Sequence, residues 1–311
     1  MIAKNVHRLE GLEPDNLLAF LALLGLLRSL DAADNCVSDA QSRLRARVSW
    51  DTDGSPLRPC LHLSTAVSQE DISRHVARGV ATLVTAYQFN GYTKLKLTPE
   101  QARDQLINVS KEKDVECAAL WAALISDAAA KDKSVERTPF CLLDVAQTSF
   151  LKTLASVVRA SDRRQEAIEK ALFQSWRWSD ETRSFRWDPI EDTRHAYRAF
   201  APSDDKQKVE RGANILAAIA LPVLTVVPRQ HGASVRLHVV GGDRRKEVFV
   251  FAWPIWKPPA SLAAIRAMLT HENLWKVDGL GHLGVQQVMV TRRIAPSRYN
   301  NFTRALPLEK G

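Results

Sequence analysis

The longest apolar stretch of the chain predicts a buried helix near the N-terminus. Residues 17–27 read LLAFLALLGLL, eleven residues without a charge. A helix that crosses a bilayer needs roughly 20 apolar residues, so this stretch is too short for a membrane span. Acidic residues precede it (Glu10, Glu13 and Asp15) and no small-residue cleavage site follows, unlike a secretory leader. We therefore expect a core helix over residues 15–34 and a cytoplasmic protein.

Capping signals and apolar spacing predict further helices. Ser68 begins an S-x-x-D pattern, and Thr98 is followed by Pro99 and then by Gln101, which resembles a capping box. Apolar residues at helical spacing indicate the remaining helices. Besides 15–34, the expected helices are 68–88, one beginning at 98, 118–130, 146–160, 162–173, 210–221 and 261–270.

Alternation of polar and apolar residues predicts strands. Residues 43–50 (RLRARVSW) alternate at period two, and residues 60–63 are expected to pair with them. Residues 234–240 and 248–253 are also strand-like, and they flank the segment GGDRRK. Because glycine supplies the positive φ of tight turns, this pattern predicts a β-hairpin with a basic tip. The aromatic stretch 176–200 is interpreted as short strands with turns, and 284–294 as a final strand.

Together these elements predict an α+β fold in which helices pack with antiparallel strands. We expect a mostly helical region with a small strand pair over residues 1–160. Residues 161–311 are expected to form a mixed, basic α+β region that contains the β-hairpin. No internal repeat, heptad run or low-complexity tract interrupts the 311 residues.

The charge is distributed unevenly between these halves. At 45% hydrophobic and 25% charged residues the chain is typical of a soluble globular protein, and its net charge is +8. Residues 1–150 hold 17 Lys and Arg against 19 Asp and Glu, whereas residues 151–311 hold 26 against 16. The positive excess therefore lies entirely in the second half. This asymmetry favours an anionic partner, and nucleic acid is the commonest one.

Cysteine spacing and the catalytic signatures argue against an enzyme. Cys36, Cys60, Cys117 and Cys141 include no C-x-x-C pair, so we expect reduced thiols and no zinc site. The chain also lacks the P-loop, G-x-S-x-G, H-E-x-x-H and G-x-G-x-x-G patterns. We accordingly expect no catalytic residue and no cofactor.

One acidic cluster offers a metal-binding alternative. Asp188, Glu191, Asp192 and His195 lie within WDPIEDTRH, and such ligands could hold Mg²⁺ or Mn²⁺ for phosphodiester cleavage. Four arginines are interspersed with them and can form surface ion pairs instead: Arg183, Arg186, Arg194 and Arg198. We expect a charged turn here and no bound metal.

Basic residues interleaved with aromatic and amide side chains predict a nucleic-acid surface. Cations contact phosphates, aromatic rings stack on bases, and amides reach base edges. The candidates at the hairpin tip are Arg244, Arg245 and Lys246. Those of the C-terminal segment are Arg292, Arg293, Arg298, Tyr299, Asn300 and Phe302. A loop with Tyr87, Asn90, Tyr92 and Lys94 has a similar composition, with core aromatic residues as the alternative.

Several segments along the chain, taken in order, have a recognisable sequence. They are LEGLEPDNLLAFLALLGLLRSLDAA (9–33), AQTSFLKTLASVV (146–158), FRWDPIEDTRHAYRAFAPSDD with GANILAAIALPVLTVVP (185–228), and VMVTRRIAPSRYNNFTRAL (288–306). They cover about a third of the chain, and none is a catalytic fingerprint, so the specificity comes from their order. Together they resemble proteins encoded with type I CRISPR effector complexes, especially the type I-G (formerly I-U) branch.

This resemblance implies a non-catalytic large-subunit-like or accessory protein of the Cascade complex. Such subunits recognise the motif that flanks the target, help to open the duplex and support recruitment of the helicase-nuclease. The implied partners are the Cascade subunits that contain crRNA, target DNA and a helicase-nuclease, with no membrane. Two alternatives remain open: a protein-interaction adaptor that uses the aromatic stretch Trp176–Phe200, and a metal-dependent nuclease at Asp188.

Overall fold

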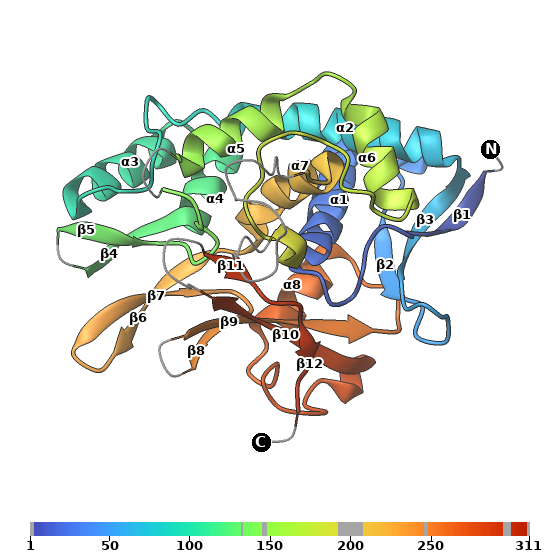
Figure 1. Cartoon of the computed structure of the whole chain (residues 1–311). Helices are drawn as coiled ribbons and strands as arrows, with labels where there is room; N and C mark the ends of the chain where they lie inside the picture. The colour runs from blue at the N-terminus through green and yellow to red at the C-terminus, as the bar shows by residue number, and fades with distance from the viewer. Residues whose placement is uncertain are drawn as a thin grey trace.

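The fold is α+β, as the sequence predicts. The computed structural model describes residues 3–131, 133–144, 148–191, 208–245, 248–294 and 300–309. Figure 1 shows most of the helices gathered in an upper layer, with the longer strands of the second half beneath them. No helix within these ranges is long and apolar enough to cross a membrane.

The helices begin where the sequence places their caps. Thr98 accepts a hydrogen bond from the Gln101 amide at 3.3 Å, and Gln101 accepts one from the Thr98 amide at 3.0 Å. Ser68 accepts one from the amide of Asp71 at 3.1 Å. The described α-helices are α1 (Leu17–Asn35), α2 (Gln69–Leu83), α3 (Pro99–Lys111), α4 (Val115–Leu124), α5 (Phe150–Arg159), α6 (Arg164–Phe173), α7 (Arg211–Ala220) and α8 (Leu262–Thr270).

The helix predicted over residues 118–130 is correct only up to Leu124. Helix α4 ends at Leu124, and the chain continues as strand β4 (Ile125–Lys131), which pairs with β5 (Ser134–Arg137). The alanine-rich sequence of β4 favours a helix locally. Pairing with a strand that follows it overrides this preference, because propensity is a weak determinant beside tertiary contacts.

The strands form two larger antiparallel sheets and two ribbons. The sheet order β1-β3-β2 places Val48 opposite Leu61, which confirms the predicted strand pair. The second sheet has the order β11-β10-β9-β8, with β12 paired to β10, and the ribbons are β4–β5 and β6–β7. The remaining bounds are β1 (Lys4–Arg8), β2 (Arg47–Trp50), β3 (Pro59–Val67), β6 (Val226–His231), β7 (Ser234–Val239), β8 (Gly242–Arg245), β9 (Val248–Trp256), β10 (Val285–Ile294), β11 (Asn301–Phe302) and β12 (Leu306–Pro307).

The predicted pairing of residues 234–240 with 248–253 is wrong. Strand β7 pairs with β6, the strand that precedes it in the chain. The chain then turns at Gly241, whose φ is 76°. Strand β8 pairs with β9, with Arg245 opposite Val248. Arg244 and Arg245 therefore lie in a strand instead of at a hairpin tip. Lys246 lies outside the described residues.

The core is built around α1, which is buried along most of its length. Helix α1 packs closely against α7: a Cβ added at Gly25 would lie 1.8 Å from the carbonyl oxygen of Leu216. Phe20 stacks on Trp253 of β9 with ring centroids 5.2 Å apart. The core thus joins residues of both halves, and in the described part of the chain it continues across the boundary predicted near residue 160.

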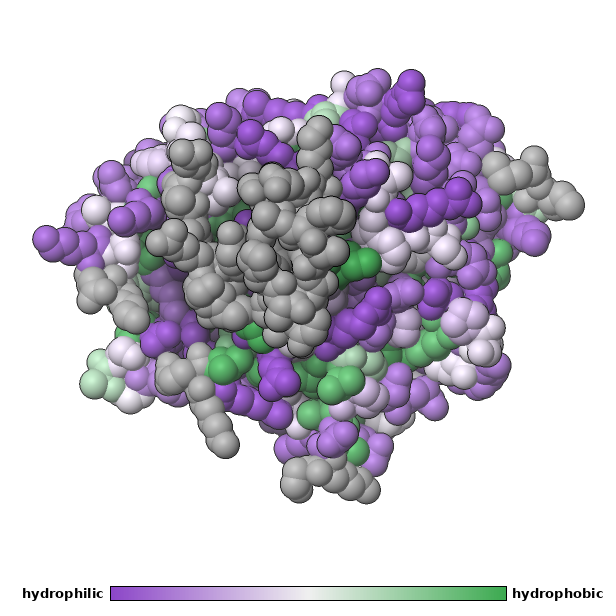
Figure 2. All heavy atoms as spheres, in the orientation of Figure 1, coloured by the Kyte–Doolittle hydropathy of each residue, from purple (hydrophilic) through white to green (hydrophobic). Residues whose placement is uncertain are grey.

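Exposed side chains differ between the two layers. In the view of Figure 2, hydrophilic residues cover most of the helical upper half, and hydrophobic residues reach the surface in a band across the lower middle. The β6–β7 ribbon extends from the lower left edge of the molecule (Figure 1), and it is the place where cations from several strands meet.

Candidate nucleic-acid interface

The β6–β7 ribbon carries its cations on one face. Arg229 lies directly opposite Arg236, and the pair Val227–His238 lies on the same face, two residues along. The other face carries Leu237 and Val239, whose side chains are buried in the core. The alternation of the two strands therefore orients one face inward and leaves the other for solvent or a ligand.

The two opposed arginines create an unfavourable contact. Like charges directly opposite in an antiparallel pair are destabilising. Arg236 is compensated by Glu136, with Nε 3.3 Å from a carboxylate oxygen. Arg229 is exposed, and none of the described residues forms an ion pair with it. An anion bound at this face would offset the repulsion.

Glu136 of β5 holds the basic strands together. Its carboxylate accepts hydrogen bonds from the backbone amide of Leu237 at 2.6 Å, from Nε of Arg236 and from Nη2 of Arg244. The Glu136 side chain is only 15% exposed. One carboxylate thus connects β5, β7 and β8 and fixes the positions of two guanidinium groups.

Arg244 and Arg245, both predicted as site residues, point to opposite faces of β8. Arg244 joins the Glu136 cluster. Arg245 stacks its guanidinium over the ring of Trp275, 4.7 Å from the centroid, and its side chain is 49% exposed. Arg245 can therefore contact a ligand on the outer surface, whereas Arg244 belongs to the interior side of the strand.

Arg292 and Arg293 of β10 also differ in their exposure to solvent. Arg292 is exposed. Arg293 is half-buried and donates to the carbonyl oxygen of Pro139 at 3.2 Å. Burial lowers the pKa of Arg293, and the nearby cations Arg137 and Arg244 lower it further. The structure thus brings Arg293 and Arg244 into one neighbourhood, although they are distant in sequence.

The base-stacking role predicted for Phe302 is wrong. Its ring is 1% exposed and lies 6.0 Å from Phe140 and 6.3 Å from Phe249, within the core. Strand β11 pairs with β10 and turns this side chain inward. Asn300 is partly exposed, and its contact with a base stays a prediction. Arg298 and Tyr299 lie outside the described residues.

Two other aromatic segments also contribute to the core. The hydroxyl of Tyr87 donates to the carbonyl oxygen of Ala218 at 2.8 Å, and Tyr92 packs on Trp121 with centroids 6.0 Å apart. In the stretch 176–200, Phe185 and Trp187 are fully buried and stack on each other at 4.4 Å. Neither of these two rings is available as a hot spot for a partner subunit, which corrects that part of the adaptor hypothesis.

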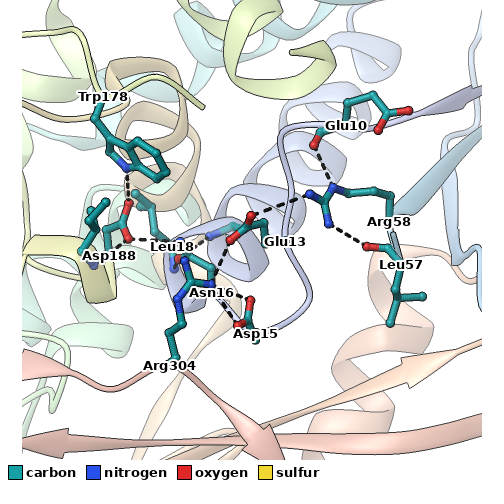
Figure 3. Close-up of polar contacts among 12 residues, drawn as sticks. Glu10, Glu13, Asp15, Asn16, Leu18, Leu57, Arg58, Trp178, Asp188 and Arg304 are labelled. Atoms are coloured by element: carbon teal, nitrogen blue, oxygen red, sulfur yellow. Dashed lines mark hydrogen bonds and ion pairs between the residues drawn. The ribbon is translucent and has the colours of Figure 1, made fainter. Parts of the chain in front are cut away.

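Asp188, the first residue of the acidic cluster, is held by hydrogen bonds from neighbouring side chains (Figure 3). Asp188 is 1% exposed and accepts hydrogen bonds from the Trp178 indole at 2.9 Å, from the Asn16 amide group at 3.1 Å and from the Ile190 amide at 3.1 Å. Asn16 in turn caps α1, accepting from the Leu18 amide at 2.9 Å. Asp188 therefore links the start of α1 to the segment 178–190.

The described part of the cluster is not the surface turn that we expected, because its carboxylates are buried. Glu191 is also buried, at 2% exposure, and the hydroxyl of Ser184 donates to it. Burial raises the pKa of Asp188, although its three hydrogen bonds oppose the rise. The described residues contain no group of three or more His, Cys, Asp or Glu that could hold a metal ion. Asp192 and His195 lie outside the described residues.

Sequence reasoning missed Arg229, Arg236 and Glu136. The signal for the first two is present in VVPRQHGASVRLHV (226–239), where two alternating runs flank a glycine, as in a hairpin. Nothing in the sequence near Glu136 indicates its role, since its partners lie about a hundred residues away along the chain. Comparisons with protein-family models, with curated proteins and with solved structures each find no match.

Proposed function

We propose that this protein binds nucleic acid through the β6–β7 ribbon and the basic residues beside it. The observation that carries the proposal is the cross-strand pair Arg229–Arg236, in which two guanidinium groups lie on one face and Arg229 has no acidic partner among the described residues. Repulsion of this kind is relieved by a polyanion. Phosphates are the anions that arginine contacts most readily, because the guanidinium donates two parallel hydrogen bonds.

The proposed setting is a type I CRISPR interference complex, in which the chain would act as a non-catalytic subunit. The sequence segments that resemble such subunits support this setting, and the excess of 26 Lys and Arg over 16 Asp and Glu in the second half agrees with it. The bound nucleic acid would be target DNA, at the flanking motif or on the displaced strand. Cascade subunits that contain crRNA and a helicase-nuclease would be its protein partners.

A salt titration tests the proposal. The purified protein is mixed with labelled duplex DNA, single-stranded DNA and single-stranded RNA, and Kd is measured as salt increases. Each phosphate that a protein contacts in duplex DNA contributes about 0.9 to the slope of log Kd against log salt, because counterions are released. We expect the double variant Arg229→Gln, Arg236→Gln to bind more weakly and to lower this slope by about two, one unit for each arginine.

A matched control changes two arginines on the helical layer. Arg74 of α2 and Arg103 of α3 are exposed and form surface ion pairs. The variant Arg74→Gln, Arg103→Gln alters the net charge by the same amount as the ribbon variant. Equal loss of affinity in both variants, or no binding of any of the three nucleic acids by the wild type at low salt, would refute the proposal.

A further inference from the structure

A pocket separates the β6–β7 ribbon from β8. Its volume is about 240 Å³. Three arginines from three different strands line it: Arg229, Arg236 and Arg244. The other polar residues of its lining are Gln230, His231, His238 and Asp243. The pocket is large enough for a tetrahedral oxyanion with part of the group that carries it.

Two arginines at this pocket have donors with no acceptor among the described residues. Arg244 commits only Nη2 to Glu136, and its buried Nε has no hydrogen-bond partner in the described part of the chain. The guanidinium of Arg229 makes no hydrogen bond with any described residue. A buried donor that stays unpaired destabilises a protein by about 1–3 kcal/mol. A ligand that supplies acceptors would therefore be stabilised here.

The charges at the pocket do not balance. Three guanidinium groups face two carboxylates, and both carboxylates are shared. Glu136 contacts Arg236 and Arg244, while Asp243, which lines the pocket, also lies 3.9 Å from Arg245. An excess positive charge remains at Arg229.

We infer that this pocket binds one phosphate group of a nucleic acid, held between Arg229 and Arg244. The inference rests on the proposed function and specifies one contact within it. Each guanidinium group can donate two parallel hydrogen bonds to phosphate oxygens, and the pocket brings together two such groups from different strands. Arg236, fixed by Glu136, lines the same pocket and adds positive charge.

His238 reports on the pocket directly. Its ring is half-buried, and burial lowers its pKa, as does the neighbouring charge of Arg229; Asp243 opposes the effect. The charged and titratable groups at the same pocket are Arg229, His231, Arg236, Asp243 and Arg244. A bound phosphate adds negative charge beside the ring, so it raises the pKa of His238.

The test follows the His238 ring by NMR while inorganic phosphate is added at constant ionic strength, with chloride as the reference anion. We expect saturable shifts and a raised His238 pKa with phosphate, and neither with chloride. Arg229→Gln should weaken phosphate binding at least about tenfold, since it removes a charged donor. Arg103→Gln is the matched control, because Arg103 lies on α3, is 61% exposed and does not line the pocket. Loss of binding in both variants, or no saturable shift in the wild type, would refute the proposal that this pocket binds phosphate.

Oligonucleotides then identify the source of the phosphate. If the pocket takes a terminal phosphate, a 5′-phosphorylated strand displaces inorganic phosphate and the 5′-hydroxyl strand does not. If it takes a backbone phosphate, both strands displace it equally. Failure of the pocket and failure of the proposed function give different results. If the protein binds DNA and His238 does not respond to phosphate, only the proposed phosphate site is refuted. If phosphate binds and no oligonucleotide displaces it, the proposed nucleic-acid function is refuted.

Discussion

Replacing Glu136 by alanine removes the acceptor that joins three strands of the basic site. The amide of Leu237, a residue that is 3% exposed, then has no partner. An unpaired buried amide costs about 1–3 kcal/mol. The ion pairs with Arg236 and Arg244 are partly exposed, at 24% and 22%, so solvent screening limits each to about 0.5–1 kcal/mol. We expect Glu136→Ala to lower the free energy of unfolding by about 2–5 kcal/mol.

Two assays measure this loss. Urea unfolding followed by tryptophan fluorescence gives the change in global stability at constant m-value. Amide hydrogen exchange at Leu237 reports the local effect. Since 1.4 kcal/mol corresponds to a factor of ten, a loss of about 2–5 kcal/mol accelerates exchange through local opening by about 30- to 4,000-fold.

Two further variants separate the hydrogen bond from the charge. Glu136→Gln keeps an oxygen acceptor for Leu237 and loses only the ion pairs, so its loss should be about half that of Glu136→Ala. Glu166→Gln breaks an exposed ion pair with Lys170 on α6 and should leave the urea midpoint unchanged. Equal losses in both Glu136 variants, or unchanged exchange at Leu237, would refute the role assigned to this carboxylate.

Two other predictions concern the core. Burial raises the pKa of Glu191 to about 8, against about 4.3 unfolded, so the folded state binds the proton more tightly and stability falls as pH rises between these values. Glu191→Gln should remove this fall in urea midpoints measured from pH 5 to pH 8, and parallel curves for variant and wild type would contradict it. Gly25→Ala should lower Tm, because the added Cβ would lie 1.8 Å from the carbonyl oxygen of Leu216. Overpacking of this kind costs about 1–3 kcal/mol, which outweighs the gain in helix propensity of at most about 1 kcal/mol. Gly281→Ala, with open space around its Cβ, should leave Tm unchanged.

Local signals predict the parts of the fold whose causes are local. The caps at Ser68 and Thr98 lie within three residues of their partners, and the apolar run of α1 is sufficient to bury a helix. The alternation of residues 43–50 predicts a strand because its apolar residues face one side. The helix prediction for the alanine-rich segment after Leu124 was wrong for the opposite reason. The contacts that make this segment a strand come from β5 and from β6–β7, outside its own sequence.

Only part of the candidate site is encoded in a short window. Residues 226–239 contain the hairpin that places Arg229 opposite Arg236, whereas Glu136 and Arg244 come from distant segments. Charge composition predicted Arg244 and Arg293 as site residues, and the structure places the two near each other. It could not show that β7 pairs with β6, nor that Phe302 turns inward toward Phe140. A basic residue and an aromatic residue adjacent in sequence can lie on opposite sides of a strand, so composition alone cannot assign both to one surface.

A carboxylate at the centre of a basic site has a physical reason. Arg236 and Arg244 are long side chains, and ordering each of them for a ligand costs about 0.5–1.5 kcal/mol of conformational entropy. Glu136 holds both in place before any ligand arrives, so this cost is met during folding. It neutralises only one charge, and Arg229 remains exposed without an acidic partner in the described chain. In the proposed function, Arg229 and Arg236 would each supply salt-dependent attraction, and the positions that Glu136 fixes for Arg236 and Arg244 would determine where a phosphate binds.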